Sequence, residues 1–134
     1  MEQRQDPTIQ LVQTRLDMAQ QALDAGELDK AQGLFERALE VKGDHPERVI
    51  RIRDYLKQYS DNAAKQTPPS WDEAHRALNL LDTLKLQDDQ TSLWDRKLWL
   101  KQADYYLKQK NLDESFEIFK NLMAGGERSA DQDK

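Results

Sequence analysis

The chain repeats one short pattern three times, as Leu28-Asp29-Lys30-Ala31, Trp71-Asp72-Glu73-Ala74 and Leu112-Asp113-Glu114-Ser115. Each version has a large apolar residue, an aspartate, a charged residue and a small residue. Further apolar residues follow the small residue at helical spacing, first Phe35, Leu78 and Phe119, then Ala38, Leu81 and Leu122. Spacing of this kind is typical of an amphipathic helix that buries one face. The pattern therefore predicts three helices with equivalent buried stripes.

Another helical pattern precedes each of these three helices. The first ends at Gly26, which can adopt the left-handed conformation that terminates a helix. The second opens at Pro46, where the missing N–H costs nothing. The third follows Thr91-Ser92, either of which can cap it. We therefore expect an all-α fold of six antiparallel helices in three pairs, over residues 8–25, 28–42, 46–64, 70–86, 92–109 and 112–124.

Composition supports helices and excludes several classes of function. The 134 residues include only four prolines and five glycines, and no segment alternates as a strand would. A net charge of −5 argues against nucleic-acid binding, which requires clustered basic residues. The absence of cysteine excludes disulfides, thiolate catalysis and sulfur-ligated metals.

Hydropathy gives no sign of a membrane span or a secretory signal. We therefore expect a cytoplasmic protein with no membrane partner. The polar ends have no apolar residues to bury, so the sequence predicts a flexible N-terminus at 1–7 and a flexible tail at 125–134. A single helical repeat domain is expected between them, over residues 8–124.

The third helix pair resembles the tetratricopeptide repeat family. Its signature positions are matched by Trp99, Gln102-Ala103, Tyr106, Ser115 and Phe119. The first pair is similar, through Met18-Ala19, Gly26, Ala31, Phe35 and Ala38. The second pair departs from the signature, because Arg53 stands where a small residue is usual. The repeat spacing also exceeds the family period of about 34 residues, with extra polar residues at 61–70 and 87–90.

The resemblance implies a short right-handed superhelix of three stacked repeats, with the first helix of each pair lining a concave side. Residues facing outward from those helices would form a partner-binding groove. In this sequence the predicted groove residues are Gln13, Leu16, Gln20, Ile50, Arg51, Asp54, Lys97, Leu100, Lys101 and Asp104. Within this set Leu16, Ile50 and Leu100 form an apolar line flanked by charges of both signs. The same three residues would instead be core if they packed against neighbouring pairs.

Some family members grip a partner's C-terminal carboxylate with basic residues from successive first helices. Lys97 and Lys101 would suit the last repeat, but the first repeat offers Leu16 and Gln20 where a lysine and an asparagine are needed. We therefore do not predict such a clamp.

Candidate chemistry elsewhere in the chain is sparse. His45 and His75 are the only histidines, and they are far apart in the sequence. The sequence has no phosphate-binding glycine loop and no nucleophile–base arrangement. We therefore predict no catalytic residues, no metal site and no cofactor.

We expect Trp71, Trp99 and Tyr106 to be core residues, because Trp99 and Tyr106 match signature positions and Trp71 lies where the second helix of a pair packs on the first. Trp94 and Tyr105 have no clear core role, and exposure of either would indicate a contact surface.

Together these features favour a non-catalytic protein–protein interaction module, an adaptor, scaffold or small chaperone, that binds a peptide or helix of another protein. The alternative is a structural role, as a spacer or self-association domain of a larger protein. An uncovered apolar edge at Phe116, Ile118 and Met123 would favour this alternative and a homodimer. A third possibility, RNA binding by helical repeats, predicts a steep loss of affinity with salt.

Overall fold

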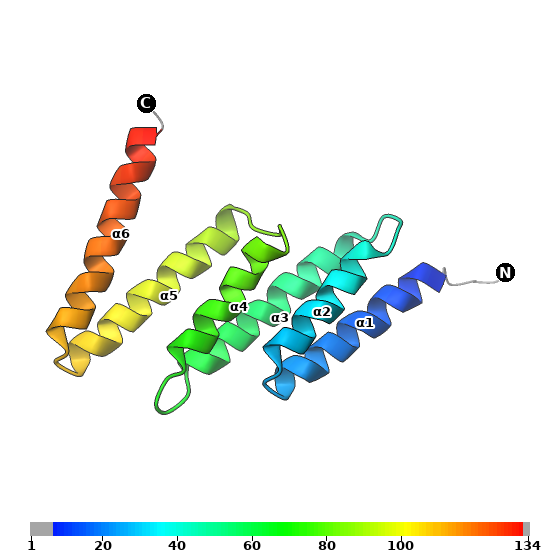
Figure 1. Cartoon of the computed structure of the whole chain (residues 1–134), viewed down its shortest axis with the longest axis horizontal. Coiled ribbons are helices and arrows are strands. Elements are labelled where there is room, and N and C mark those ends of the chain that lie inside the picture. Colours follow the sequence, from blue (N-terminus) through cyan, green and yellow to red (C-terminus); the bar gives the residue numbers. More distant parts are fainter. Residues whose placement is uncertain (1–6, 133–134) are drawn as a thin grey trace. The chain divides into compact units, whose positions relative to one another are not determined.

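The computed structural model describes the backbone of residues 7–132 and the side chains of residues 7–124. Within this part the chain is all helical and has no strand, which confirms the predicted class (Figure 1). The predicted flexible ends, 1–7 and 125–134, fall almost wholly outside the residues whose side chains are described. The helices are α1 (Pro7–Asp24), α2 (Leu28–Glu40), α3 (Pro46–Ala64), α4 (Trp71–Thr83), α5 (Asp89–Lys108) and α6 (Leu112–Gln132).

Helix ends follow local sequence signals. Gly26 terminates α1 with a φ of 77°, and the N–H of Glu27 donates to the carbonyl of Ala22 at 2.8 Å. The same arrangement ends α5, where Lys110 has a φ of 62° and Asn111 donates to Tyr106 at 2.8 Å. These bonds satisfy carbonyls that a helix end leaves without partners. The expected left-handed residue at Gly26 is therefore confirmed.

The start of α5 differs from the prediction that Thr91 or Ser92 caps it. Asp88 is the N-cap, and its carboxylate accepts a hydrogen bond from the Thr91 N–H at 2.8 Å. In return the Thr91 hydroxyl accepts one from the Asp88 N–H at 2.8 Å. This reciprocal capping box satisfies two free donors, so α5 begins at Asp89.

The last helix is longer than predicted, because α6 runs to Gln132, past the expected end at 124.

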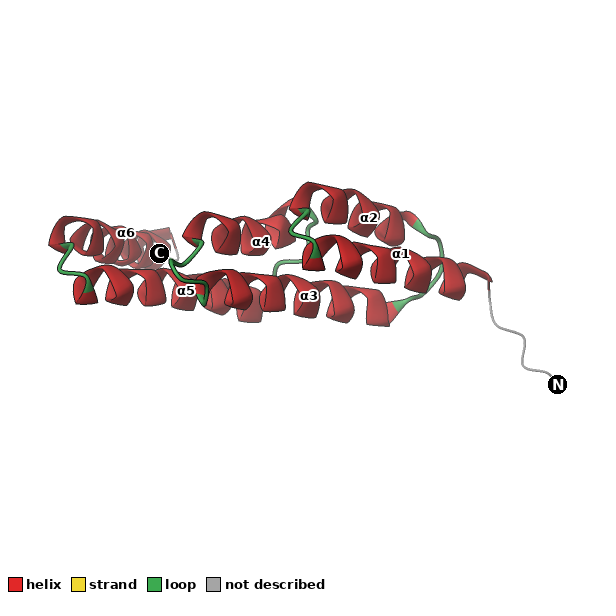
Figure 2. Ribbon diagram, turned by 90° about the horizontal axis from the view of Figure 1, so that it is seen from below, coloured by secondary structure: helices red, strands yellow, loops and turns green. Residues whose placement is uncertain are grey.

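The chain forms two compact units, Met1–Gln87 and Asp88–Lys134. In the first unit α1 packs on α2, α3 packs on α4, and α1 also packs against α3 (Figure 2). This packing confirms the predicted pairs. The core contains the side chains of Leu16, Phe35, Ile52, Leu56 and Leu81, each at most 1% exposed. Trp71 is also buried, as predicted.

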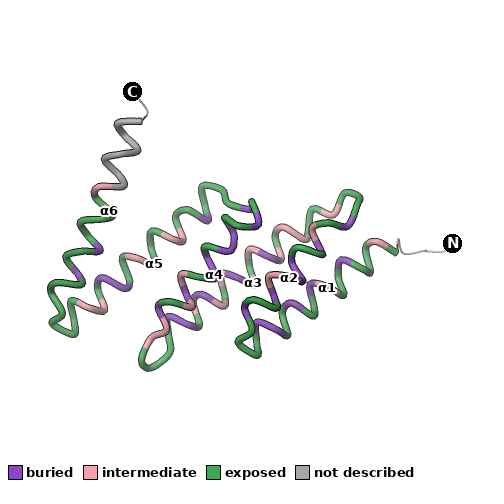
Figure 3. Tube along the Cα trace, in the orientation of Figure 1, coloured by how far each residue is buried: buried purple, intermediate pink, exposed green. Residues whose placement is uncertain are grey.

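In the second unit α5 packs against α6. The Ser115 hydroxyl donates to the Ala103 carbonyl at 3.0 Å, and Ile118 is buried. The prediction that Phe119 belongs to the buried stripe is wrong, because its side chain is 38% exposed. Ser115 and Ile118 supply the buried side of α6, so the apolar residues of its other side stay in contact with solvent. Figure 3 shows α6 as largely exposed between 112 and 124.

The aromatic residues of α5 are less buried than the family resemblance implies. Trp99 and Tyr106, expected in the core, are half-buried, and so are Trp94 and Tyr105. Tyr105 and Tyr106 meet edge to face, with ring centroids 5.8 Å apart. None of the helices in the described part of the chain is long and apolar enough to cross a membrane.

Candidate functional site

Two pockets lie one after the other between α1 and α3 of the first unit. The first, of about 290 Å³, is near the C-terminal ends of both helices, and the second, of about 170 Å³, is near their N-terminal ends. The two helices therefore run parallel. We call the two pockets together the α1–α3 groove. The first pocket is lined by Gln20, Leu23, Asp24, Gly26, Tyr55, Gln58, Tyr59, Asn62, Ala63, Gln66 and Glu73.

One face of each helix supplies the polar residues along this groove. On α1 these are Gln13, Asp17, Gln20 and Asp24, and on α3 they are Glu47, Arg51, Tyr55, Gln58 and Asn62. Successive members are three or four positions apart, so each set forms a continuous row along its helix.

A bridge between the two helices separates the pockets. The Arg51 guanidinium on α3 donates to the Asp17 carboxylate on α1 at 2.8 Å. It also lies over the Tyr55 ring, 5.3 Å from the centroid, and donates to the Tyr55 hydroxyl. A cation held between a carboxylate and an aromatic face gains from both contacts. The bridge therefore links α1 to α3 and fixes the ring of Tyr55.

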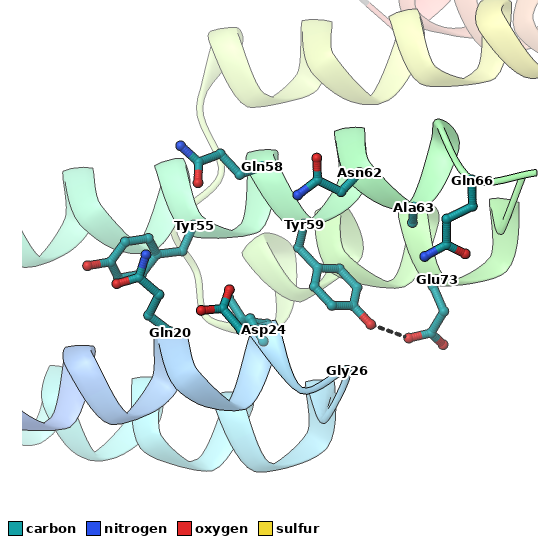
Figure 4. A pocket seen from close by; sticks show the side chains of 11 residues that line it. Gln20, Asp24, Gly26, Tyr55, Gln58, Tyr59, Asn62, Ala63, Gln66 and Glu73 are labelled. Carbon is teal, nitrogen blue, oxygen red and sulfur yellow. Dashed lines mark hydrogen bonds between the residues drawn. The ribbon is translucent and has the colours of Figure 1, made fainter.

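A second polar network forms one wall of the first pocket. The Tyr59 hydroxyl donates to Glu73 at 2.7 Å (Figure 4), and Arg76 donates to the other oxygen of the same carboxylate at 2.7 Å. Burial and then the contact with Glu73 raise the pKa of Tyr59 to about 12. The hydrogen bonds from Tyr59 and Arg76 lower the pKa of Glu73, although partial burial opposes them. Glu73 is thus an anion that is held by two donors, the Tyr59 hydroxyl and the Arg76 guanidinium.

Asp24 differs from Glu73, because its exposed carboxylate has no ion pair or hydrogen bond within the described part of the chain. It belongs to the last turn of α1 and projects toward α3, between the rings of Tyr55 and Tyr59 (Figure 4). Side-chain amides of Gln20, Gln58, Asn62 and Gln66 line the same pocket. Each amide can both donate and accept hydrogen bonds, which suits a peptide backbone.

The second pocket is more apolar. Ile9, Val12 and Leu16 line it from α1, and Asp44, His45, Pro46, Glu47, Arg48 and Arg51 surround it from the other side. Arg48 is held in place because its guanidinium donates to the carbonyls of Ala38 and Val41 at 2.9 and 2.8 Å. An apolar wall with a few fixed polar groups is typical of binding pockets.

Four predicted groove residues of the first unit line the two pockets of the groove. Gln13 and Arg51 line the second pocket, and Gln20 lines the first. Leu16 also lines the second pocket, but its side chain is only 1% exposed. Its assignment to an outward-facing apolar line is therefore wrong: α1 packs against both α2 and α3, and Leu16 belongs to the packed face.

Ile50 and Asp54 are exposed on α3, and Ile50 is 59% exposed. Neither lines a pocket of the groove. Each precedes a groove residue by one position, which turns it about 100° around the helix. The four other predicted residues, Lys97, Leu100, Lys101 and Asp104, lie exposed on α5 of the second unit. Their part in binding stays a prediction.

Sequence reasoning missed Asp24, Tyr55, Tyr59 and Glu73 as groove residues. A usable signal existed for Asp24, which follows the predicted groove residue Gln20 by four positions and so lies on the same face of the helix. No such signal existed for Glu73, which reaches the pocket only because α4 packs back on α3.

Other chemistry is sparse in the described residues, which contain no cluster of three or more His, Asp or Glu able to hold a metal ion. His45 is half-buried, and a ring nitrogen contacts the Lys42 carbonyl at 3.1 Å.

Comparison of the chain with protein-family models, with curated proteins and with solved structures found no match.

Proposed function

We propose that this chain is a non-catalytic protein–protein interaction module that binds a peptide or helix of another protein in the α1–α3 groove. The observation that carries the proposal is the alignment of two pockets along the same two parallel helices. In this proposal the helix pairs are tetratricopeptide-like repeats, and the groove is the concave side lined by their first helices.

The dimensions of the groove suit a short segment. The 18 residues of α1 span about 27 Å, which matches an extended peptide of about eight residues. The apolar second pocket would supply affinity, because burial of an apolar side chain is favourable there. The amide-rich first pocket would fix the register and direction of the bound chain.

A matched pair of bulky substitutions tests this proposal. Gln20 lines the first pocket, whereas its neighbour Gln21 is exposed on the same helix and does not line it. Peptides selected from a displayed library against the unmodified protein would be titrated against Gln20→Trp and Gln21→Trp. We expect Gln20→Trp to weaken binding at least about tenfold, since one buried contact of about 1.4 kcal/mol has that effect. Gln21→Trp is expected to bind normally.

A substitution at the other end of the groove completes the test. Gln13→Trp would fill the second pocket and is expected to weaken the same peptides. Selected peptides that bind Gln20→Trp and Gln13→Trp as tightly as the unmodified protein would contradict the proposal. Circular dichroism of each variant separates loss of binding from loss of folding.

Self-association is the second candidate function, and the exposed side of α6 favours it. Leu112, Phe116 and Met123 are 61%, 68% and 66% exposed, and Phe119 completes the same row. A continuous apolar stripe of this kind is unusual on a solvent-exposed surface that has no binding partner. In an antiparallel pair of α6 helices, Leu112 would face Met123 and Phe116 would face Phe119 of the other copy. Asp113 and Lys120, beside the stripe, would then meet with opposite charges.

Sedimentation over a range of concentrations tests self-association. We expect a dimer that dissociates on dilution, and a monomer for Phe116→Lys, because a charge would be buried at the centre of the interface. Ile50→Lys is the control, since Ile50 is a comparably exposed apolar residue on α3. A chain that stays monomeric at high concentration would exclude this candidate.

A further inference from the structure

We infer that Asp24 anchors a basic side chain of the bound partner, an arginine, between Tyr55 and Tyr59. This inference rests on the proposed function, because it names the chemistry of the segment that enters the α1–α3 groove. It concerns the first pocket only, and so it can fail while peptide binding elsewhere in the groove stands.

The bridge in the middle of the groove contains the same interaction within the chain itself. There Asp17 of α1 and Tyr55 of α3 hold the guanidinium of Arg51, with 2.8 Å to the carboxylate and 5.3 Å to the ring centroid. Carboxylate, cation and phenol are thus arranged in one layer across the two helices.

Two helical turns further along both helices, a similar set of side chains occurs, but without the positive charge. Seven residues return a helix to nearly the same face. Asp24 therefore occupies on α1 the place that Asp17 has in the bridge, and Gln58 occupies on α3 the place of Arg51. Tyr59 adds a second phenol one turn after Tyr55. The pocket repeats the acid and the aromatic walls, but it has a neutral amide where the bridge has a guanidinium.

The charges around the pocket favour a cation. Its lining residues include two carboxylates, Asp24 and Glu73, and no lysine, arginine or histidine. Glu73 shares Arg76 with Asp29, at 2.7 and 2.8 Å, whereas Asp24 has no ion pair among the described residues. Asp24 is in the last turn of α1, and Asn62 and Ala63 are in the last turn of α3. The C-terminal ends of both helices add negative potential there.

Arginine fits this site better than lysine. A planar guanidinium can stack on a phenol ring and donate two parallel hydrogen bonds to a carboxylate, which an ammonium cannot. Its remaining N–H groups would find acceptors in the amide oxygens of Gln20, Gln58 and Asn62. The pocket volume of about 290 Å³ is at the small end of the range for ligand sites, which suits one side chain.

The test uses the full chain and three short peptides. They are acetylated, amidated Gly-Ser-Xaa-Ser-Gly, in which Xaa is arginine, lysine or citrulline, the last being a neutral analogue of arginine. Binding is followed by nuclear magnetic resonance of the Tyr55 and Tyr59 ring signals at low salt. We expect the arginine peptide to bind most tightly, and the citrulline peptide about tenfold more weakly, since a charged donor makes a stronger hydrogen bond to a carboxylate than a neutral donor does.

Three variants connect the effect to Asp24. Asp24→Asn is expected to remove the preference for arginine over citrulline. The matched control is Asp82→Asn, because Asp82 is an exposed aspartate in the last turn of α4 and lines none of the groove. It should keep the preference. Gln58→Arg would place a guanidinium within the pocket, as Arg51 does in the bridge, and should exclude the arginine peptide.

Each result decides the inference separately from the proposed function. If the arginine and citrulline peptides shift the same ring signals equally, the groove binds peptides and the arginine anchor is wrong. The anchor is also overturned if Asp24→Asn keeps the preference, or if Asp82→Asn loses it to the same extent. If no peptide shifts the ring signals, the anchor is overturned, and library peptides that still respond to Gln13→Trp would leave the proposed function standing.

Discussion

The Tyr59–Glu73 hydrogen bond is a polar contact whose effect on stability depends on pH. The pKa of Glu73 is lowered in the folded protein. The stability that ionised Glu73 contributes is therefore fully present above the pKa of the unfolded state, about 4.3, and is lost as the pH falls through the folded pKa. We expect Tyr59→Phe to lower the free energy of unfolding by about 1 kcal/mol at neutral pH. The difference should shrink in acid, once Glu73 is protonated.

Urea denaturation at several pH values measures this effect. A carboxyl titration of the same variant should show the pKa of Glu73 moving up toward its ordinary value, because the Tyr59 hydrogen bond is the largest cause of the shift. An equal loss of stability at neutral and acid pH would mean that the hydroxyl acts through packing alone.

The sequence predicts that Leu16 and Ile50 both belong to the apolar line of the groove, but the two side chains differ in burial. Leu16 is 1% exposed and Ile50 is 59% exposed. We expect Leu16→Ala to lower the free energy of unfolding by about 2–4 kcal/mol, the usual cost of a core cavity. Ile50→Ala should change it by less than about 0.5 kcal/mol. Chemical denaturation of the two variants side by side checks this, and similar losses would contradict the assigned burial.

These two residues show why helical spacing predicts a core only in part. Spacing places a residue on one face of its own helix, but it does not say how many other helices that face meets. Leu16 is buried because α1 packs on both α2 and α3. Glu73 and Tyr59 likewise meet only through the packing of α3 on α4. Local periodicity could not predict that contact.

At the scale of single helices, the Asp88–Thr91 capping box should stabilise the first turn of α5. Asp88→Ala removes an acceptor that lies 2.8 Å from the Thr91 N–H. We expect it to cost about 1 kcal/mol of stability. Ser92→Ala is the control, since the exposed Ser92 hydroxyl takes no part in the box. Thermal unfolding followed by circular dichroism measures both, and equal losses would show that the box is not what caps the helix.

The helices themselves were the most predictable level of this protein. The third helix begins and ends where expected, at Pro46 and Ala64. Its start was predictable because proline is favoured in the first turn of a helix. The start of α5 was missed because the box has Asp first and Thr fourth, whereas the common signature has Ser or Thr followed by Glu or Gln. On α6 the apolar residues occupy two sides, and their spacing could not tell which side meets α5.

At the scale of the whole chain, the two compact units differ in how much apolar core they contain. Among the described residues, the buried apolar side chains of the second unit are Leu98, Ala103 and Ile118, whereas α3 alone contributes Ile52 and Leu56 at 0% exposure. Local opening is easiest where few apolar side chains are buried. The second unit should therefore open at lower free energy than the first.

Native-state hydrogen exchange in increasing denaturant tests this difference. We expect the amides of α3 to exchange last, through global unfolding, and the amides of α5 and α6 to exchange earlier through a separate opening. Asp88→Ala should speed exchange in α5, since the substitution removes the N-cap acceptor of that helix. If α5, α6 and α3 instead merge into one exchange isotherm, the chain opens as a single cooperative body, and a partner could not bind one unit while the other is open.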